Sequence, residues 1–253
     1  MTRNIITIFN QKGGVGKTTT AINLAAYLAK SSKQVLLIDI DPQSNATSGL
    51  GVDINSLATS VYEVLLNPGL LGTAIVSTST KNLSLLPAKH ALSAAEVDLV
   101  NLPERETKLK KALSNAEYDY VIIDCPPALG LLTINALVAA TSVVIPVQAE
   151  YYAMEGLGQL LSIVQRVRET INPSLELLGV LLTMYDSRNS LAEQVESELH
   201  KHLGDKLLET VIPRNVRLAE APSFGRTIIE HDKWSKGARA YKQLAKEIID
   251  HAK

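Results

Sequence analysis

The sequence has very few of the residues that support disulfide, metal-cluster or membrane chemistry. It contains one cysteine, Cys125, among 253 residues, which excludes a disulfide framework within the chain and any zinc or iron–sulfur site built on four cysteines. Aromatic residues make up only 4% of the chain, so its core must be mainly aliphatic. No apolar run approaches the roughly 18 residues of a membrane span, and the N-terminus has no signal-peptide pattern. These absences favour a reducing, cytoplasmic setting.

The net charge of −1 gives no overall attraction to nucleic acid, but the charges are unevenly distributed. Residues 210–246 hold eight Lys and Arg against three Asp and Glu. A local basic excess of this kind suits contact with a phosphate backbone, although a solvated surface with scattered ion pairs has the same composition.

Residues 10–20 (NQKGGVGKTTT) carry the strongest motif of the chain. They follow the apolar run 5–9, which predicts a buried strand, and precede a helical pattern of apolar residues. A strand, a glycine-rich turn and a helix start form a loop whose backbone N–H groups surround phosphates. In such a loop Lys17 contacts the β- and γ-phosphates and the Thr18 hydroxyl is a ligand of Mg²⁺. The predicted cofactors are therefore ATP and Mg²⁺, and the predicted nucleotide-binding residues of the loop are Gly13, Gly14, Val15, Gly16, Lys17, Thr18 and Thr19. The ordinary motif does not require the lysine at Lys12.

Three aspartates follow predicted strands and suit phosphoryl transfer. Asp124 ends the apolar run 120–123 and is the expected Mg²⁺ partner. Asp39 and Asp41 lie two residues apart, so in an extended segment their side chains share a face. We assign Asp39 to the metal shell and Asp41 to the attacking water, which it would position rather than deprotonate; the reverse assignment of these two remains open.

The alternation of elements predicts an α/β fold: a doubly wound, mostly parallel sheet flanked by helices, of the Rossmann-like P-loop NTPase class. No linker or repeat interrupts it, so we expect residues 1–253 to form a single domain, and residues 44–52 to form a mobile loop near the phosphates. The predicted strands are 5–9, 34–39, 83–86, 118–124, 143–147, 177–184 and 208–212, and the predicted helices include 61–66, 104–114, 132–140, 154–169, 191–203 and 236–252.

The motifs together resemble the ParA/MinD superfamily of deviant P-loop ATPases. The extra lysine, Lys12, is the signature of that family's loop, and residues 39–47 (DIDPQSNAT) and 124–127 (DCPP) match its next two motifs. Residues 211–223 (VIPRNVRLAEAPS) closely resemble the chromosomal ParA, or Soj, branch. The resemblance extends from about residue 5 to about residue 249.

The resemblance implies a role for Lys12 that the loop chemistry alone does not. In this family two ATP-bound monomers form a face-to-face homodimer, and the signature lysine reaches the phosphates of the opposite subunit, like an arginine finger supplied in trans. The catalytic residues would then be Lys12, Lys17 and Asp41. The alternative is that Lys12 only supports its own loop. By the same resemblance Pro213 and Asn215 would contact the adenine.

Other branches of the superfamily carry different functions. A nitrogenase-type electron carrier needs cluster-ligating cysteines that Cys125 alone cannot provide. A MinD-like ATPase, whose ATP dimer binds a membrane or positions another cargo, remains the alternative, because residues 239–250 form an amphipathic helical pattern. Such a pattern is more typical of a helix packed on its own sheet, so we expect no membrane binding.

The ParA interpretation accounts for the basic C-terminal region. Arg188 and Arg217 match positions at which Soj-like proteins contact DNA, and nothing resembles a base-reading motif, so binding to double-stranded DNA should be non-specific. The motif starts near the N-terminus, so we expect no N-terminal helix-turn-helix domain of the kind that longer plasmid proteins carry. The resemblance thus implies an ATP-dependent switch for DNA segregation. Its ATP dimer binds the nucleoid and is released by slow hydrolysis, which a ParB-type centromere-binding partner stimulates.

Overall fold

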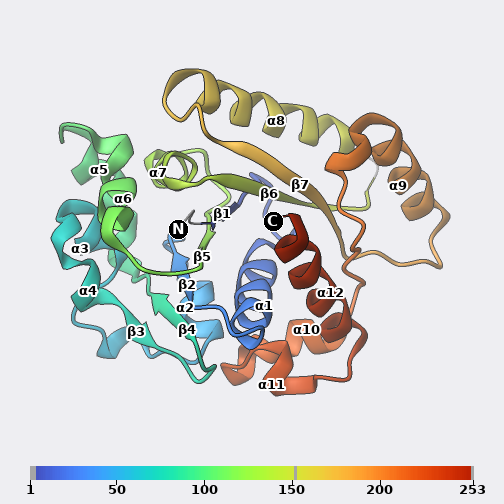
Figure 1. Cartoon of the computed structure of the whole chain (residues 1–253), viewed down its shortest axis with the longest axis horizontal. Helices are drawn as coiled ribbons and strands as arrows, with labels where there is room; N and C mark the ends of the chain where they lie inside the picture. The colour runs from blue at the N-terminus through green and yellow to red at the C-terminus, as the bar shows by residue number, and fades with distance from the viewer. Residues whose placement is uncertain (1–3, 151–152, 252–253) are drawn as a thin grey trace.

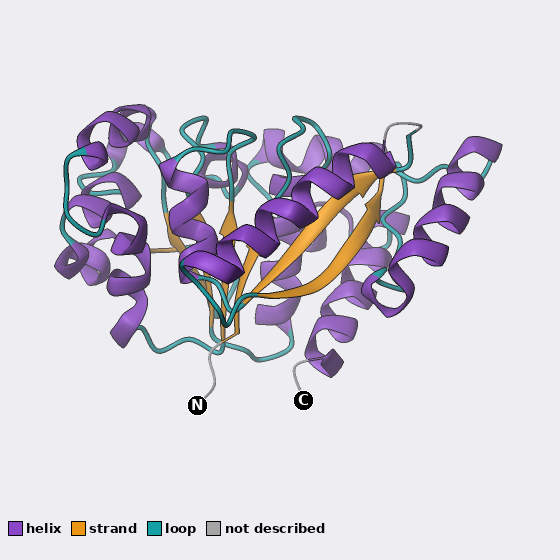
Figure 2. Ribbon diagram, turned by 90° about the horizontal axis from the view of Figure 1, so that it is seen from above, coloured by secondary structure: helices purple, strands orange, loops and turns teal. Residues whose placement is uncertain are grey.

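The computed structural model describes residues 4–150 and 153–251, and these form a sheet covered by helices on both faces (Figures 1 and 2). Seven strands make up the sheet within this part of the chain, in the order β3-β4-β2-β5-β1-β6-β7. Every neighbouring pair is parallel except β3 with β4. The strands are β1 (Asn4–Ile8), β2 (Val35–Asp39), β3 (Val76–Ser77), β4 (Leu83–Leu86), β5 (Tyr120–Asp124), β6 (Ser142–Gln148) and β7 (Glu176–Thr183).

The helices divide between the two faces of the sheet. One face is covered mainly by α1 and α12, with α2, α10 and α11 beside them, and the other by α3 and α5 to α9. The helices are α1 (Lys17–Lys30), α2 (Asn45–Gly49), α3 (Val61–Leu66), α4 (Leu71–Ala74), α5 (Ala95–Val100), α6 (Lys108–Ala112), α7 (Leu131–Ala139), α8 (Ala153–Thr170), α9 (Ser190–Leu203), α10 (Val216–Glu220), α11 (Ile228–Asp232) and α12 (Lys236–His251).

The central strands are apolar throughout because both of their faces are covered. On β5, Ile122 packs into the core beneath α1, whereas Val121 and Ile123 pack into the opposite core. Successive strand side chains point to opposite faces, so a continuous aliphatic run supplies both cores at once. The predicted α/β class with a mostly parallel sheet is confirmed.

Three predicted elements are wrong in detail. Residues 44–52 contain the helix α2, and Ala46 and Thr47 within it are buried. The predicted helix 104–114 is broken into 3₁₀ turns on either side of the short α6. Residues 208–212 form no strand; they run beside β7 with single hydrogen bonds such as Leu208 N–H to the Val180 carbonyl, 2.9 Å. The short edge strand β3 was not predicted.

Candidate functional site

The glycine-rich loop joins β1 to α1 at the carboxyl edge of the sheet. Gly14 and Gly16 have φ angles of 75° and 87°, a left-handed backbone that glycine adopts without steric cost. Gly16 is also the N-cap of α1, and no side chain caps that helix. The first N–H groups of α1 therefore remain available to an anion, and the helix dipole adds a partial positive charge there. The loop has the construction that the sequence predicted for a phosphate cradle.

Two polar side chains, Asn10 at the start of the loop and Thr183 of the distant strand β7, hold this loop in place, and the sequence did not reveal these roles. The Asn10 amide accepts a hydrogen bond from the Lys12 N–H (2.8 Å) and donates one to the Pro146 carbonyl (2.7 Å). The Thr183 hydroxyl, at the end of β7, donates to the Val15 carbonyl at 2.9 Å. Asn10 and Thr183 are both buried. Their only sequence signal is that each polar residue lies at the end of an apolar strand.

The two lysines of the loop occupy different environments. Lys17 is 7% exposed, and its ammonium group donates to the Lys12 carbonyl at 2.9 Å. Burial lowers the pKa of Lys17, while Asp124, Cys125 and Asp41 act in the opposite direction. Lys12 has a side chain that is 57% exposed, and its ammonium group is paired with Glu150, after β6. Lys17 thus lies at its own cradle, and Lys12 lies at the rim.

The predicted aspartates meet at the same edge because of strand register. Asp124 ends β5 and is the direct neighbour of Asp39, which ends β2, and of Ile8, which ends β1 before the loop. Asp41 follows two residues beyond Asp39 and is also buried. The structure therefore brings Asp39, Asp41 and Asp124 together next to Lys17, as the strand pattern predicted.

Asp124 is a buried carboxylate without a partner. Neither of its oxygens has a hydrogen-bond partner within the described part of the chain. Burial, with the charge of Asp39 next, raises the pKa of Asp124 well above its usual value, while the nearby Thr18 hydroxyl and Lys17 pull it down. Such an orphaned carboxylate next to a phosphate cradle fits a divalent cation. Residues 4–150 and 153–251 hold no cluster of three or more His, Cys, Asp or Glu that could bind a metal ion.

Asp39 is engaged in holding a neighbouring loop. One of its oxygens accepts the N–H of Asp41 at 3.1 Å, and the other accepts the N–H and the hydroxyl of Thr47 at 2.8 and 2.7 Å. The Thr47 hydroxyl also accepts the N–H of Ala88, 2.9 Å away, beyond β4. These bonds stabilise the helix α2 at residues 45–49. They explain why this segment, which the sequence predicted to be a mobile loop, is helical. They also fix the backbone that carries Asp41.

Replacing Thr47 with valine is expected to lower kcat about tenfold while leaving the KM for ATP nearly unchanged, because losing such outer contacts costs about 10–100-fold. Thr47→Ser keeps the hydroxyl and should restore the rate. Steady-state ATPase kinetics and thermal unfolding test both variants. The control is Thr7→Val, which removes another buried hydroxyl, bonded to the Ala136 carbonyl; it should lower stability without lowering kcat. Equal kcat losses in Thr47→Val and Thr7→Val would contradict a positioning role for Thr47.

Pro213 and Asn215 line a cleft of about 200 Å³ that opens beside the loop. Gly16 and Thr19 also line this cleft, as does Met184, which follows the end of β7. Met184 has a φ angle of +51°, an unusual backbone for a non-glycine residue and one that occurs at functional sites. The cleft is mainly apolar and adjoins the phosphate cradle. The structure thus places Pro213 and Asn215 where a planar base could follow the phosphates.

Arg188 and Arg217 lie on exposed segments next to this cleft. The segment that carries Arg188 runs beside the one that precedes Arg217, through hydrogen bonds between Tyr185 and residues 212 and 214. The Arg188 side chain is 88% exposed and paired with Asp186 at 2.7 Å. Arg217 is 56% exposed and is paired with Glu220 at 2.9 Å. Each arginine is therefore accessible, and each has an acidic neighbour that partly neutralises it.

The amphipathic C-terminal helix packs on its own sheet. Tyr241, Leu244 and Ile248 of α12 are buried in the core beneath α1, and the Tyr241 hydroxyl lies 3.0 Å from that of Thr20. This arrangement confirms the interpretation that the apolar stripe faces the sheet. None of the described helices combines the length and the apolarity needed to cross a bilayer.

Comparison with known proteins agrees with these motifs. Residues 3–177 match the model of a family described as an AAA domain. The chain is 55% identical to the sporulation initiation inhibitor protein Soj of Bacillus subtilis over 246 residues, 96% of this chain and 97% of the relative. It belongs to the ParA/Soj family of chromosome-partitioning ATPases. Another family member, the chromosome-partitioning ATPase Soj of Thermus thermophilus, is 54% identical, with 96% and 94% of the two chains covered.

A solved structure shares the fold of this ParA/Soj-family ATPase. It is the cobyrinic acid a,c-diamide synthase from Mycobacterium smegmatis with a bound ATP analogue and magnesium. The TM-score is 0.87 at 39% identity, and the match covers 99% of this chain and 96% of the other. The nucleotide and metal are those of that protein. The uncapped start of α1 and the unpartnered Asp124 are the features of the ParA/Soj-family chain that fit the same two ligands.

Proposed function

We propose that this ParA-type ATPase binds ATP and Mg²⁺ at the glycine-rich loop, closes into a homodimer over the nucleotides, and in that state binds duplex DNA without sequence preference. The observation that carries the proposal is the contrast between the loop lysines. The buried Lys17 serves its own cradle, and Lys12 stands at the rim. A second subunit facing the rim would receive Lys12 next to its phosphates.

Within one subunit, the position of each site residue indicates its role. Lys17 and the first N–H groups of α1 hold the phosphates, and the Pro213 and Asn215 cleft holds the base. Thr18 and Asp124 would hold Mg²⁺, which neutralises charge on the β- and γ-phosphates. Asp39 supports Asp41 through the network with Thr47 rather than standing free toward a metal. This favours Asp41 as the residue that orients the attacking water.

Asp41 is held for that task. One of its oxygens accepts the N–H of Gln43 at 2.9 Å, and its backbone is fixed by Asp39. An ionised carboxylate is a weak base, so its contribution is to orient water toward the γ-phosphate. The slow hydrolysis expected from positioning alone suits a switch whose ATP state must persist, and a ParB-type partner would accelerate it.

Dimer closure makes weak DNA contacts effective. Arg188 and Arg217 are exposed but paired with acidic residues, so a single subunit offers little net attraction. Two subunits double the number of phosphate contacts, and the second set binds at a high effective concentration. The affinity should fall steeply as the salt concentration rises, because each phosphate contact releases counterions. In a cell the ATP dimer would therefore associate with the nucleoid.

Asp41→Ala protein is expected to accumulate as an ATP-bound dimer that binds DNA, because ATP binding remains while water is no longer oriented. Gel filtration with ATP, ADP or no nucleotide measures the dimer, and repeating it with a mixed-sequence duplex measures the DNA complex. Asp41→Ala combined with Arg217→Glu is the matched variant: it should dimerise and fail to bind the duplex. A protein that stays monomeric with ATP would contradict the switch. A protein that forms the dimer with ATP but does not bind the duplex would contradict only the proposed DNA binding.

A further inference from the structure

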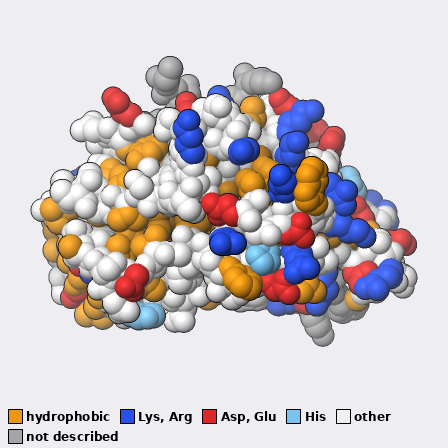
Figure 3. All heavy atoms as spheres, turned by 90° about the horizontal axis from the view of Figure 1, so that it is seen from below, with side chains coloured by type: hydrophobic (Ala, Val, Ile, Leu, Met, Phe, Trp, Pro, Cys, Tyr) orange, Lys and Arg blue, Asp and Glu red, His pale blue; other side chains and the backbone are white. Residues whose placement is uncertain are grey.

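The strongest surface feature outside the nucleotide site is an exposed tryptophan among basic side chains. Trp234, the single tryptophan of the chain, is 78% exposed in the turn between α11 and α12. Val216 and Phe224, on neighbouring segments, are 70% and 62% exposed. Figure 3 shows basic side chains gathered on this side of the molecule with hydrophobic ones among them. We call Val216, Arg217, Phe224, Lys233, Trp234 and Lys236 the aromatic–basic surface.

A shared carboxylate places the tryptophan next to Arg217. One oxygen of Asp232 accepts the N–H of Trp234 at 3.1 Å, and the other lies 3.6 Å from Nε of Arg217. The backbone of Trp234 is therefore linked, through Asp232, to the arginine that is already proposed to contact DNA. The two groups come from different elements, the α11–α12 turn and α10, and are joined only in the folded protein.

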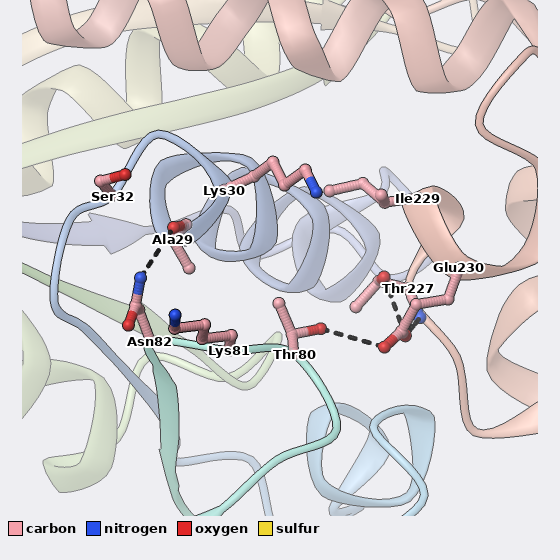
Figure 4. Close-up of a pocket in the computed structure, with 9 residues that line it drawn as sticks. All are labelled: Ala29, Lys30, Ser32, Thr80, Lys81, Asn82, Thr227, Ile229 and Glu230. Carbon is pink, nitrogen blue, oxygen red and sulfur yellow. Dashed lines mark hydrogen bonds between the residues drawn. The ribbon is translucent and has the colours of Figure 1, made fainter.

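The turn that carries the indole is held on both sides. On the α11 side, Glu230 accepts the N–H and the hydroxyl of Thr227, both at 3.0 Å, and the hydroxyl of Thr80 at 3.2 Å (Figure 4). On the α12 side, the Ser235 hydroxyl donates to the Asp232 carbonyl at 2.9 Å and accepts the Ala238 N–H at 3.1 Å. The backbone of the turn is thus held in place, and the large side chain that it carries is exposed to solvent. Such an arrangement suits contact with a partner.

Lys233 and Lys236 flank Trp234 in the sequence and favour an anionic partner, because the nearby Asp232 carboxylate is already paired with Arg217. The Lys233 ammonium lies 5.1 Å from the centre of the indole ring. Lys233 and Lys236 form no ion pair with any residue in 4–150 or 153–251. A cation over the indole and a second lysine two residues beyond it combine positive charge with an exposed apolar ring. This combination matches duplex DNA, in which phosphates border a groove whose sugars and base edges accept apolar side chains.

We propose that Trp234 contacts duplex DNA directly, with its indole in a groove and Lys233 and Lys236 on the flanking phosphates. This inference rests on the proposed function and extends its DNA interface from isolated arginines to a surface with an apolar centre. Duplex DNA is favoured over an anionic membrane because the apolar face of α12 is buried in the core, which leaves a single indole rather than a helix to insert.

The fluorescence of Trp234, the single tryptophan of the chain, provides the test. With ATP and Mg²⁺ present, adding a mixed-sequence duplex to the wild-type protein should change the Trp234 emission. Anisotropy of a labelled duplex should show about tenfold weaker binding by Trp234→Ala, the scale of losing one aromatic contact with nucleic acid. Lys236→Ala should also reduce the slope of log affinity against log salt by about one, and Trp234→Ala should not. DNA-independent ATPase activity should be unchanged in both.

Val97→Ala is the matched control, because Val97 is 74% exposed but lies on α5, on the opposite face of the sheet. It should bind the duplex like the wild type. If Trp234→Ala also binds like the wild type while Arg217→Glu does not, the tryptophan contact is wrong and the DNA-binding function stands. If the wild type binds no DNA at all, the proposed function itself fails. An emission shift with anionic phospholipid vesicles and none with the duplex overturns the inference in favour of a membrane.

Discussion

Lys12→Ala is expected to lower the ATPase rate by about three orders of magnitude while leaving ATP binding by the monomer within a few-fold of wild type, the scale of losing a finger supplied in trans. Lys12 is half exposed at the rim of the loop and pairs with Glu150. An exposed ion pair of this kind contributes little stability, so the ammonium group can leave it for a phosphate. Steady-state ATPase assays, gel filtration with ATP and equilibrium nucleotide binding separate these effects.

The matched control for Lys12 is Lys111→Ala. Lys111 is similarly exposed and is paired with Glu104, but it lies on α6, away from the loop. Its loss should change neither the rate nor the dimer.

Complementation distinguishes a trans role from a cis role. A mixture of Lys12→Ala and Asp41→Ala proteins should recover part of the activity, since one site of each mixed dimer has its own Asp41 and the other subunit's Lys12. A cis role for Lys12 predicts that neither site of the mixed dimer is complete. If a mixture that is shown to form mixed dimers recovers no ATPase activity, Lys12 does not act in trans.

Asp124→Asn is expected to lower Mg²⁺-dependent ATPase activity about 100-fold or more, the upper range for residues that orient a metal's ligands, and yet to make the protein without nucleotide more stable at neutral pH. The wild-type carboxylate is fully buried and unpartnered. A buried charge without a partner destabilises the folded state. The isosteric amide removes that charge and also removes the negative group that fits the cation.

The stability difference should depend on pH in a defined direction. Burial raises the pKa of Asp124 in the folded state, whereas the unfolded chain keeps a value of about 3.9. Near pH 4 and below, both states are protonated and the wild type and Asp124→Asn should differ little. As the pH rises toward the folded-state pKa, only the unfolded state gives up its proton, so the wild type loses stability relative to the variant.

Denaturant unfolding from pH 4 to pH 8 measures the difference between wild type and Asp124→Asn. Asp205→Asn, at an exposed aspartate, is the control and should show no such trend. A variant that is less stable than wild type across the whole range would show that Asp124 has a structural partner. Adding Mg²⁺ and ATP should stabilise the wild type far more than the variant.

The sequence by itself determined the chemistry that depends on neighbours along the chain. Residues 10–20 predict the loop because glycines, a lysine and a threonine at fixed spacing suffice for a strand–turn–helix cradle. Asp39 and Asp124 could be placed at one edge because parallel strands end together, and their direct register bears this out. The aliphatic runs of β2 and β5 predicted strands covered on both faces, since such runs serve two cores at once.

Only the tertiary structure decided which groups meet across the sheet. The polar composition of residues 44–52 is typical of a mobile loop. In the structure, however, the Thr47 hydroxyl bonds to the Asp39 carboxylate and to the Ala88 N–H, and these bonds stabilise the helix α2. Residues 208–212 have the composition of a strand but make only single bonds to β7. The pairs Glu150 with Lys12 and Asp232 with Arg217 each come from separate elements. No local pattern encodes these pairings, because they depend on loop paths and side-chain directions that are set when the helices pack on the sheet.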